Sequence, residues 1–269
     1  MNIATSKGTA LITGASSGIG AVYADRLARR GYDLILVARN KNRLNELATR
    51  LTIDTGRTVQ TLSADLSIES DIALVEKVLR TDASITLLVN NAGVGATSKL
   101  LDSDPAKMAS MITLNVSALA RLATVAARGF AARGAGSIIN ISSIVAIAPE
   151  LLNGVYGGTK AFVLAFSQSM HHELAEKGVR VQVVLPGAIS TEFWDVAGLP
   201  VEHLPQGIVM TAFDLVDAAL AAFDQGELVT VPSLPDVADW DAFERARQHL
   251  GPNLSRSEPA KRYGIRSVA

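Results

Sequence analysis

Short apolar runs alternate along this chain with longer segments of helical periodicity. Turn or polar residues follow each of seven such runs, at 9–12, 33–38, 58–63, 85–89, 137–141, 179–185 and 228–231. Several runs are apolar at successive positions, which is typical of strands buried on both faces of a parallel sheet. The segments between them predict helices over 19–30, 41–51, 69–80, 105–132, 155–176 and 213–223. This alternation predicts an α/β fold with a doubly wound parallel sheet and helices on both faces.

Composition narrows the class of protein further. The net charge is −1, which gives no overall basic field to attract nucleic acid or an anionic membrane. Cysteine is absent, which rules out disulfides, zinc–thiolate sites and cysteine catalysis, and the four histidines lack the spacing of a zinc site. No apolar stretch predicts a transmembrane helix, and no signal peptide is visible. We expect a soluble, cytoplasmic protein without a metal site and without nucleic-acid or membrane partners.

A glycine-rich turn at 13–20, with the sequence TGASSGIG, follows the first run and opens a helix. Glycine here permits a tight turn, lets the backbone approach a pyrophosphate and lets the helix pack closely on the strand. The helix N-terminus adds free N–H groups and a positive dipole end. The spacing is GxxxGxG and no lysine follows, which disfavours a P-loop. The turn predicts a dinucleotide site formed by Gly14, Ser16, Ser17, Gly18, Ile19 and Gly20.

A basic residue, Arg39, stands at the end of the second run, where many dinucleotide sites have an acid that binds the adenosine ribose. A guanidinium suits a 2′-phosphate, and Arg43 or Lys41 could assist it. The alternative is a solvated residue at a strand end. We expect NADP(H) to be preferred, with NAD(H) still open. Asp65, followed by Leu66, is placed beside the adenine in this interpretation, although Asp65 could equally cap a helix.

Tyr156 and Lys160 are four residues apart in a predicted helix, so their side chains lie on one face. A free phenol has a pKa of about 10, and a nearby ammonium lowers it. Such a tyrosine can give a proton to a developing alkoxide or take one from an alcohol. Ser143 lies thirteen residues earlier, where its hydroxyl can hydrogen-bond the substrate oxygen. Taken alone, a Tyr–Lys pair also fits a solvated helix surface, but the serine at a strand end favours a site at the carboxyl edge of the sheet.

These motifs together resemble the classical short-chain dehydrogenase/reductase family. Besides TGxxxGxG, Ser143 and YxxxK, the matching elements are NNAG at 90–93, Asn115 in the long helix, and Pro186-Gly187 with Thr191 downstream. Their order and spacing agree over roughly residues 8–232. The resemblance implies a Rossmann-type sheet of seven strands in the order 3-2-1-4-5-6-7. It also implies NAD(P)-dependent hydride transfer on carbonyl or secondary alcohol groups.

The resemblance implies a role for each matching residue. Tyr156 is similar to the catalytic acid/base, Lys160 to the residue that lowers its pKa and binds the nicotinamide ribose, and Ser143 to the hydroxyl that orients the substrate. Asn115 resembles the residue whose backbone carbonyl supports a proton-relaying water. The further cofactor-binding residues implied are Asn91, Ala92, Gly93, Pro186, Gly187, Ile189 and Thr191.

The substrate is expected to contact 94–101, 144–155 and 192–210, and a lid over about 190–212 belongs to the first domain, 1–232. These segments carry apolar side chains such as Leu152, Phe193 and Trp194, which favours an apolar substrate. The same side chains could instead pack on the sheet or on another subunit. The extension at 233–269, with a helix predicted over 236–250, is expected to pack on the domain or on a neighbouring subunit. The long helices resemble those of the family's subunit contacts, so a homodimer or homotetramer is expected.

Three other functions stay open. One is a catalytically silent regulatory or scaffold protein that binds a dinucleotide, although binding alone does not need the Ser143–Tyr156–Lys160 set. Another is an epimerase or dehydratase, but the extended relatives with that activity resemble a TGxxGxxG pattern and carry a larger C-terminal domain. The last is a nucleic-acid or membrane module, which the near-neutral charge opposes.

Overall fold

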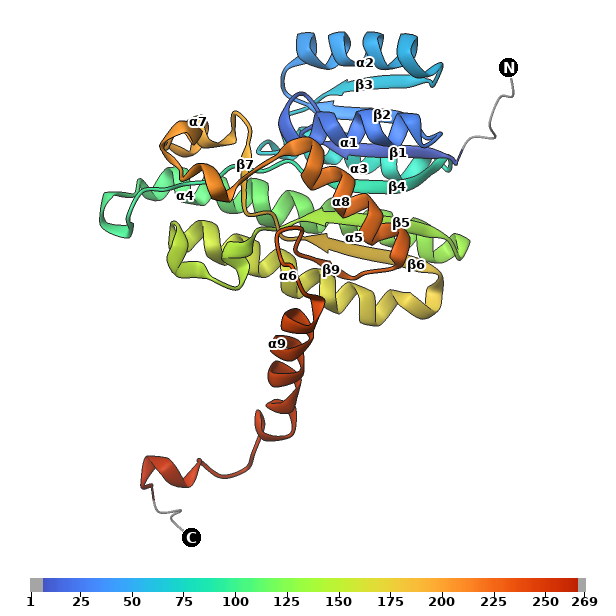
Figure 1. The fold of residues 1–269 in the computed structure, drawn as a ribbon. Helices are drawn as coiled ribbons and strands as arrows, with labels where there is room; N and C mark the ends of the chain where they lie inside the picture. The colour runs from blue at the N-terminus through green and yellow to red at the C-terminus, as the bar shows by residue number, and fades with distance from the viewer. Residues whose placement is uncertain (1–6, 266–269) are drawn as a thin grey trace. The chain divides into compact units, whose positions relative to one another are not determined.

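The computed structural model describes residues 7–265, and its internal contacts divide the chain into two units, with the boundary between Pro232 and Ser233. The first unit is built on a seven-stranded parallel sheet (Figure 1). Its strands are β1 (Thr9–Thr13), β2 (Asp33–Ala38), β3 (Val59–Ser63), β4 (Ile85–Asn90), β5 (Gly136–Ile141), β6 (Val179–Val184) and β9 (Val229–Thr230). Their order is β3-β2-β1-β4-β5-β6-β9. This confirms the predicted fold, because β9 is the seventh strand of the sheet.

Helices cover both faces of the sheet. They are α1 (Gly18–Arg29), α2 (Lys41–Thr55), α3 (Glu69–Thr81), α4 (Pro105–Ile112), α5 (Leu119–Arg133), α6 (Gly154–Leu174) and α8 (Ala212–Gln225). Successive strand residues point to opposite faces. Ala10 and Ile12 of β1 therefore join a core cluster with α1, α2 and α8, whereas Leu11 joins a second cluster with α3, α5 and α6. Burial on both faces explains why the strands are apolar at successive positions.

The predicted helix over 105–132 is interrupted in the structure. A π-helical turn, Thr113–Ala118, separates α4 from α5. The whole run 105–133 is long and apolar enough to span a membrane by length and composition alone. Its buried side chains, such as Leu122 and Phe130, belong to the core cluster beneath the sheet, so the fold accounts for their apolar character.

A small two-stranded parallel sheet joins the two ends of the lid segment. It pairs β7 (Ala188–Ser190) with β8 (Val209–Thr211), and α7 (Phe193–Ala197) lies between them in the sequence. Helix α8 follows β8 directly and is capped by Thr211, whose Oγ1 accepts a hydrogen bond from the backbone N–H of Asp214. The sequence predicted the lid but not this sheet, because three-residue strands leave no recognisable apolar pattern.

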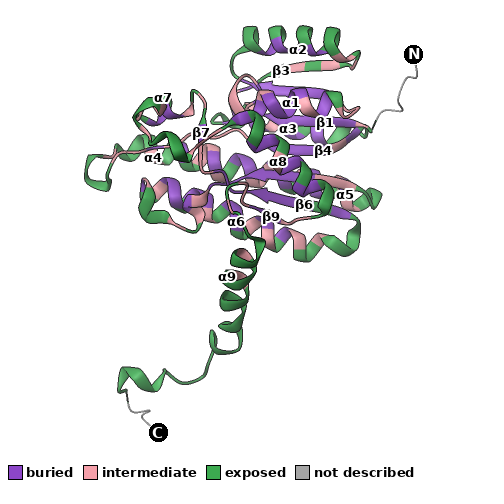
Figure 2. Ribbon diagram, in the orientation of Figure 1, coloured by how far each residue is buried: buried purple, intermediate pink, exposed green. Residues whose placement is uncertain are grey.

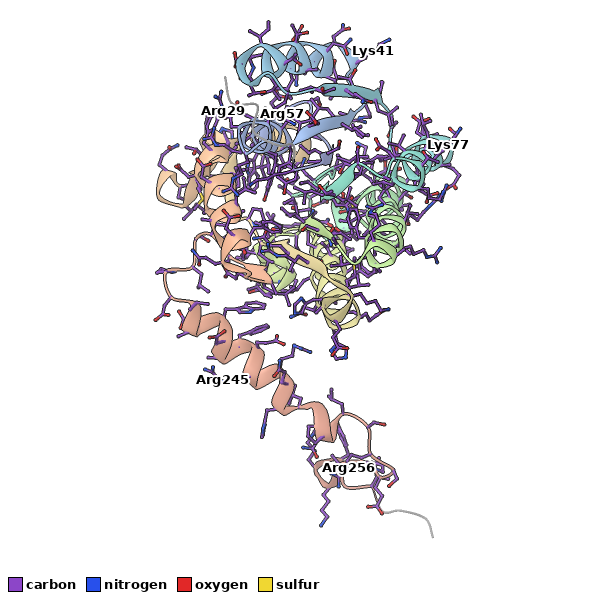
Figure 3. All side chains as sticks on the ribbon, turned by 90° about the vertical axis from the view of Figure 1, so that its right-hand side faces the viewer. Arg29, Lys41, Arg57, Lys77, Arg245 and Arg256 are labelled. Carbon is purple, nitrogen blue, oxygen red and sulfur yellow. The ribbon has the colours of Figure 1, made fainter. Side chains whose placement is uncertain are left out.

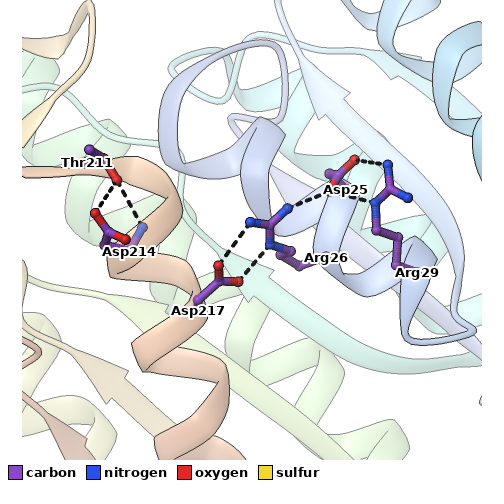
Figure 4. Close-up of polar contacts among 6 residues, drawn as sticks. All are labelled: Asp25, Arg26, Arg29, Thr211, Asp214 and Asp217. Carbon is purple, nitrogen blue, oxygen red and sulfur yellow. Dashed lines mark hydrogen bonds and ion pairs between the residues drawn. The ribbon is translucent and has the colours of Figure 1, made fainter.

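Ion pairs join α1 to α8, as Figure 4 shows. The Arg26 guanidinium donates to both carboxylate oxygens of Asp217, at 2.6 and 2.9 Å. It also donates to Asp25, which in turn accepts from Arg29. The helix that opens at the glycine turn is thus tied to the helix that follows the lid.

Basic side chains come from several elements of the first unit. Figure 3 labels Arg29 on α1, Lys41 on α2 and Lys77 on α3. Arg57 donates to Asp33 at 3.1 and 3.0 Å across the β2–β3 edge. Carboxylate partners therefore offset part of the positive charge, in keeping with the net charge of −1.

The second unit contains one α-helix in its described part, α9 (Val237–His249), within the predicted 236–250. Asp236 caps it by accepting a hydrogen bond from the N–H of Ala238 at 2.8 Å. Trp240 and Phe243 pack together, with ring centroids 5.3 Å apart. No residue between 233 and 265 is buried, and Figure 2 draws nearly all of α9 as exposed.

Candidate active site

One cavity of about 590 Å³ lies at the carboxyl ends of the central strands. The glycine turn, the end of β2 and the segments after β3 and β4 form one part of it. The segments after β5 and β6, the start of α6 and the lid form the rest. Of the residues predicted for catalysis or for the dinucleotide site, Gly20, Lys41 and Asn115 are outside its described lining. Within residues 7–265, no three acidic or histidine side chains gather as metal ligands would.

The glycine turn is shaped by backbone conformations and close approaches that side chains would prevent. Gly14 and Gly18 have φ values of 65° and 53°, in the left-handed region that favours glycine. A Cβ at Gly14 would lie 2.8 Å from Nδ2 of Asn91, and one at Gly20 would overlap the carbonyl of Gly14. Helix α1 begins at Gly18, and its N-cap Ser17 makes no side-chain capping bond in the described chain. The turn therefore presents free backbone N–H groups to the cavity, which fits a pyrophosphate.

The NNAG segment locks this turn to the end of β4. Asn91 Nδ2 donates to the carbonyls of Thr13 and Gly14, at 3.0 and 3.2 Å. Thr13 Oγ1 accepts from the N–H groups of Asn91 and Ala92, both at 3.0 Å. Four hydrogen bonds thus join two sequence motifs 77 to 79 residues apart. The side chain of Asn91 is committed to shaping the turn.

Two arginines lie at the far end of the cavity. The side chain of Arg39 is 72% exposed, and its Nη1 lies 3.9 Å from Oδ2 of Asp65. Arg43 Nη1 donates to Oε2 of Glu192 at 2.6 Å. Asp65 also accepts from the backbone and the hydroxyl of Ser67, and together with the charge of Arg39 these bonds lower its pKa against the opposing effect of partial burial. Guanidinium groups such as these can bind a phosphate. The bonds from Ser67 show that Asp65 caps the turn before α3.

The other end of the cavity holds the three predicted catalytic side chains. Ser143, Tyr156 and Lys160 are all buried, and a hydrogen bond joins Ser143 to Tyr156. Lys160 Nζ donates to the carbonyl of Ile141 at 3.0 Å and lies 5.8 Å from the ring centroid of Tyr156. Asn153 caps α6 by accepting from the N–H of Tyr156 at 3.2 Å, which fixes where the tyrosine enters the cavity.

The pKa of Tyr156 departs from the sequence prediction. Burial raises it to about 12, while the hydrogen bond to Ser143 acts in the opposite direction. Burial also lowers the pKa of Lys160 to about 8. The pKa of the phenol in the chain alone therefore lies above its usual value and not below it as predicted, because burial outweighs the hydrogen bond that lowers it. At neutral pH the tyrosine is a protonated donor.

Asn115 sits in the π-helical turn and is 1% exposed. Its Oδ1 accepts from the N–H of Val94 at 3.0 Å, and its Nδ2 donates to the carbonyl of Val94 at 2.8 Å and to Oγ1 of Thr159 at 3.1 Å. Thr159 Oγ1 donates to the carbonyl of Tyr156 at 2.8 Å. The side chain of Asn115 thus joins the loop after β4 to the helix that carries Tyr156.

Aromatic side chains of the lid form a wall beside the tyrosine. The Phe193 ring lies 5.9 Å from that of Tyr156 and meets Trp194 edge-on at 5.8 Å. The ring of Phe193 occupies the space where a Cβ at Gly95 would be, a contact that the sequence alone did not reveal. Thr97 Oγ1 donates to the carbonyl of Ala197 at 2.8 Å, which holds α7 on the loop after β4.

Apolar side chains from two of the segments expected to contact the substrate, 144–155 and 192–210, line the cavity. They are Ile144, Val145, Leu151, Leu152, Phe193, Trp194, Val196, Leu204 and Ile208. Leu199 and Met210, in the second of these segments, are outside its described lining, whereas Leu114 contributes from outside the expected segments. Leu114 was missed because it lies in the π-helical turn, which the sequence did not indicate.

A family model described as short chain dehydrogenase matches residues 8–198. The chain belongs to the short-chain dehydrogenase family. It is accordingly an oxidoreductase that uses a nicotinamide dinucleotide to interconvert alcohols and ketones.

Two solved structures are similar over almost the whole chain. A short-chain dehydrogenase from Sphingobium yanoikuyae in complex with NADPH is 50% identical, with a TM-score of 0.93 over 95% of this chain and 99% of that one. A bulky-bulky ketone specific alcohol dehydrogenase from Comamonas testosteroni is 46% identical, with a TM-score of 0.89 over 96% and 99%. The human 17-beta-hydroxysteroid dehydrogenase type 3 is 37% identical over 186 residues, which are 68% of this chain and 59% of that protein.

Proposed function

We propose that this chain interconverts a bulky, apolar ketone and its secondary alcohol, prefers NADP(H), and uses Tyr156 as its acid/base. The observation that carries the proposal is the arrangement of one cavity. Ser143, Tyr156 and Lys160 lie buried at its apolar end, and Arg39 and Arg43 lie at the other.

The chemistry divides between the cofactor and the side chains. A dinucleotide held by the glycine turn and by Arg39 and Arg43 would supply the hydride for reduction and would accept it in oxidation. Ser143 hydrogen-bonds the substrate oxygen and holds it beside the phenol. Tyr156 gives its proton to that oxygen in reduction and takes it back in oxidation. The Lys160 ammonium favours the phenolate left after proton transfer.

Two observations support the cofactor preference. Arg39 and Arg43 stand at the cavity end where a 2′-phosphate would lie, and a guanidinium binds phosphate by charge-assisted bonds. The similar Sphingobium yanoikuyae structure is a complex with NADPH. NAD(H) lacks the phosphate and would leave both arginines without this ligand.

The lining of the cavity supports the substrate class. Val145, Leu152 and Phe193 surround the phenol with apolar surface, which excludes water and favours an apolar ligand. Two relatives, a bulky-bulky ketone specific alcohol dehydrogenase and a hydroxysteroid dehydrogenase, have names that agree with this lining. We infer a ketone with an apolar group on each side of the carbonyl.

The proposal extends to assembly and location. We infer a cytoplasmic homodimer or homotetramer in which the 233–269 segment packs on the first unit or on a neighbouring subunit. The supporting observation is the lack of any buried residue between 233 and 265, although Val237, Phe243 and Leu254 are apolar. Several exposed apolar side chains gathered on one segment are typical of a surface that contacts a partner.

The test is Tyr156→Phe, assayed on a panel of ketones with NADPH and NADH. We expect turnover to fall by about 10²- to 10⁴-fold, because the proton donor is lost, while NADPH binding followed by fluorescence persists. An unchanged rate would show that Tyr156 is not the acid/base. Wild-type activity restricted to hydrophilic polyols would reject the apolar substrate. NADPH binding without turnover on any ketone would favour the silent regulatory protein.

A further inference from the structure

An ion pair bridges the cavity at its arginine end. Arg43 lies in the first turn of α2, and Glu192 directly follows Thr191 in the lid. Arg43 Nη1 donates to Glu192 Oε2 at 2.6 Å although the residues are 149 positions apart, and both line the cavity. The pair therefore ties the helix after β2 to the lid.

Another anion can replace Glu192 as the partner of Arg43. The two side chains are 48% and 61% exposed, and ion pairs this exposed contribute little to stability. A phosphate monoester carries a charge of about −1.5 to −2 and three acceptor oxygens, so it attracts a guanidinium more strongly than one carboxylate does. Arg39, four residues earlier at the same end of the cavity, adds a second guanidinium to such a site.

The same lid segment also reaches the catalytic end. Phe193, next to Glu192, packs on Tyr156 with ring centroids 5.9 Å apart. The position of residues 192 and 193 thus depends on Arg43 at one end of the cavity and on the tyrosine at the other. Whatever draws Arg43 away from Glu192 removes one of the contacts that hold this segment in place.

We propose that Glu192 is a specificity-determining residue that competes with the cofactor 2′-phosphate for Arg43, so that NADP(H) binding releases this end of the lid and NAD(H) binding does not. The proposal rests on the NADP(H) preference proposed above. It assigns Glu192 two effects: it weakens the binding of the 2′-phosphate, and it links that binding to the segment that carries Phe193.

The first test measures binding without catalysis. 2′,5′-ADP and 5′-AMP, which differ only in the 2′-phosphate, are titrated by calorimetry into wild type, Glu192→Gln, Arg43→Gln and the double variant. We expect Glu192→Gln to lower the Kd for 2′,5′-ADP by about two- to five-fold, with a much smaller change in the Kd for 5′-AMP. In the Arg43→Gln background the gain should disappear. Glu202→Gln removes the same charge from the lid at a residue outside the described lining, and should change neither affinity.

The second test follows the lid itself. We expect 2′,5′-ADP to raise amide hydrogen exchange over residues 191–198 of wild type, and 5′-AMP to leave it unchanged. In Glu192→Gln, exchange should be high from the start and respond to neither ligand. Exchange that does not respond to 2′,5′-ADP would overturn the release of the lid.

The outcomes separate the two proposals. If 2′,5′-ADP binds wild type no more tightly than 5′-AMP, the NADP(H) preference and the role of Glu192 are both wrong. If 2′,5′-ADP binds more tightly but Glu192→Gln leaves its affinity unchanged, or tightens it equally in the Arg43→Gln background, the cofactor preference stands and the competition is wrong.

Discussion

Phe193 of the lid lies against Tyr156, with the two ring centroids 5.9 Å apart and their planes tilted by 47°. The phenylalanine fits because Gly95, beneath its ring, has no side chain. An aromatic ring therefore covers the phenol of Tyr156 on the side of the lid, and a substrate that reaches the phenol must pack against that ring.

Replacing Phe193 with alanine should weaken the use of bulky ketones. The loss of a large apolar contact removes about 1–3 kcal/mol, so we expect kcat/KM to fall roughly ten-fold or more for bulky ketones and much less for small ones. Steady-state kinetics with both substrates measure this. Gly95→Ala should act similarly, because its new Cβ would displace the Phe193 ring. Phe213→Ala, an exposed phenylalanine outside the described lining, is the matched control. Equal losses for small and bulky ketones would contradict the proposed wall.

Replacing Arg39 with glutamine should reduce the preference for NADP(H). The guanidinium is 72% exposed at the cavity edge, and a charge-assisted bond to phosphate contributes about 1.5–3 kcal/mol. We expect the Kd for NADPH to rise at least ten-fold and that for NADH to change little, as measured by fluorescence titration. Lys41→Gln removes a charge close by, outside the described lining, and should have a small effect. A parallel loss for both cofactors would show that Arg39 does not recognise the phosphate.

Lys160 should give the folded protein a specific dependence on pH. Burial lowers its pKa from 10.5 to about 8, so between these values the unfolded chain binds a proton that the folded chain does not. Stability therefore rises with pH in this window, by about 2 kcal/mol between pH 8 and 10. Denaturant unfolding of wild type and Lys160→Met at both values should show that rise only in wild type.

A surface lysine provides the control for this measurement. Lys177 is exposed in the short 3₁₀ turn that follows α6, and Lys177→Met should keep the wild-type slope. Ionisation of tyrosines in the unfolded chain near pH 10 acts equally on all three proteins, so the difference between them isolates Lys160. The same slope in Lys160→Met and wild type would show that the buried amine does not cause it.

Removing residues 233–269 should leave the first unit folded. Among the residues that the structure describes, all buried side chains lie between positions 9 and 230. Far-ultraviolet circular dichroism should show a cooperative thermal transition in the truncated chain, whereas light scattering should show a smaller assembly than the full chain forms. An unchanged assembly size, together with an unchanged KM, would argue against packing of this segment on a neighbouring subunit or over the site.

The repeated pattern of apolar runs and helices was predictable because burial on both faces of a parallel sheet makes each strand apolar throughout. The order of the strands was not in the pattern and came from the resemblance of the motifs. The Arg43–Glu192 bridge joins residues 149 positions apart, and no local pattern reports such a contact. The pKa of Tyr156 was predicted with the wrong sign, because spacing places the lysine but does not reveal how completely the phenol is buried.

The π-helical turn around Asn115 contains a wider coil than an α-helix would form from the same stretch. Deleting one residue between 113 and 118 would let α4 and α5 merge into one regular helix with stronger backbone bonding. That change would also rotate Asn115 away from Val94 and Thr159 and so detach the loop after β4 from the helix of the tyrosine. The irregular turn thus gives up regular backbone bonding at one point of a long helix and in return allows Asn115 to join two segments that border the cavity.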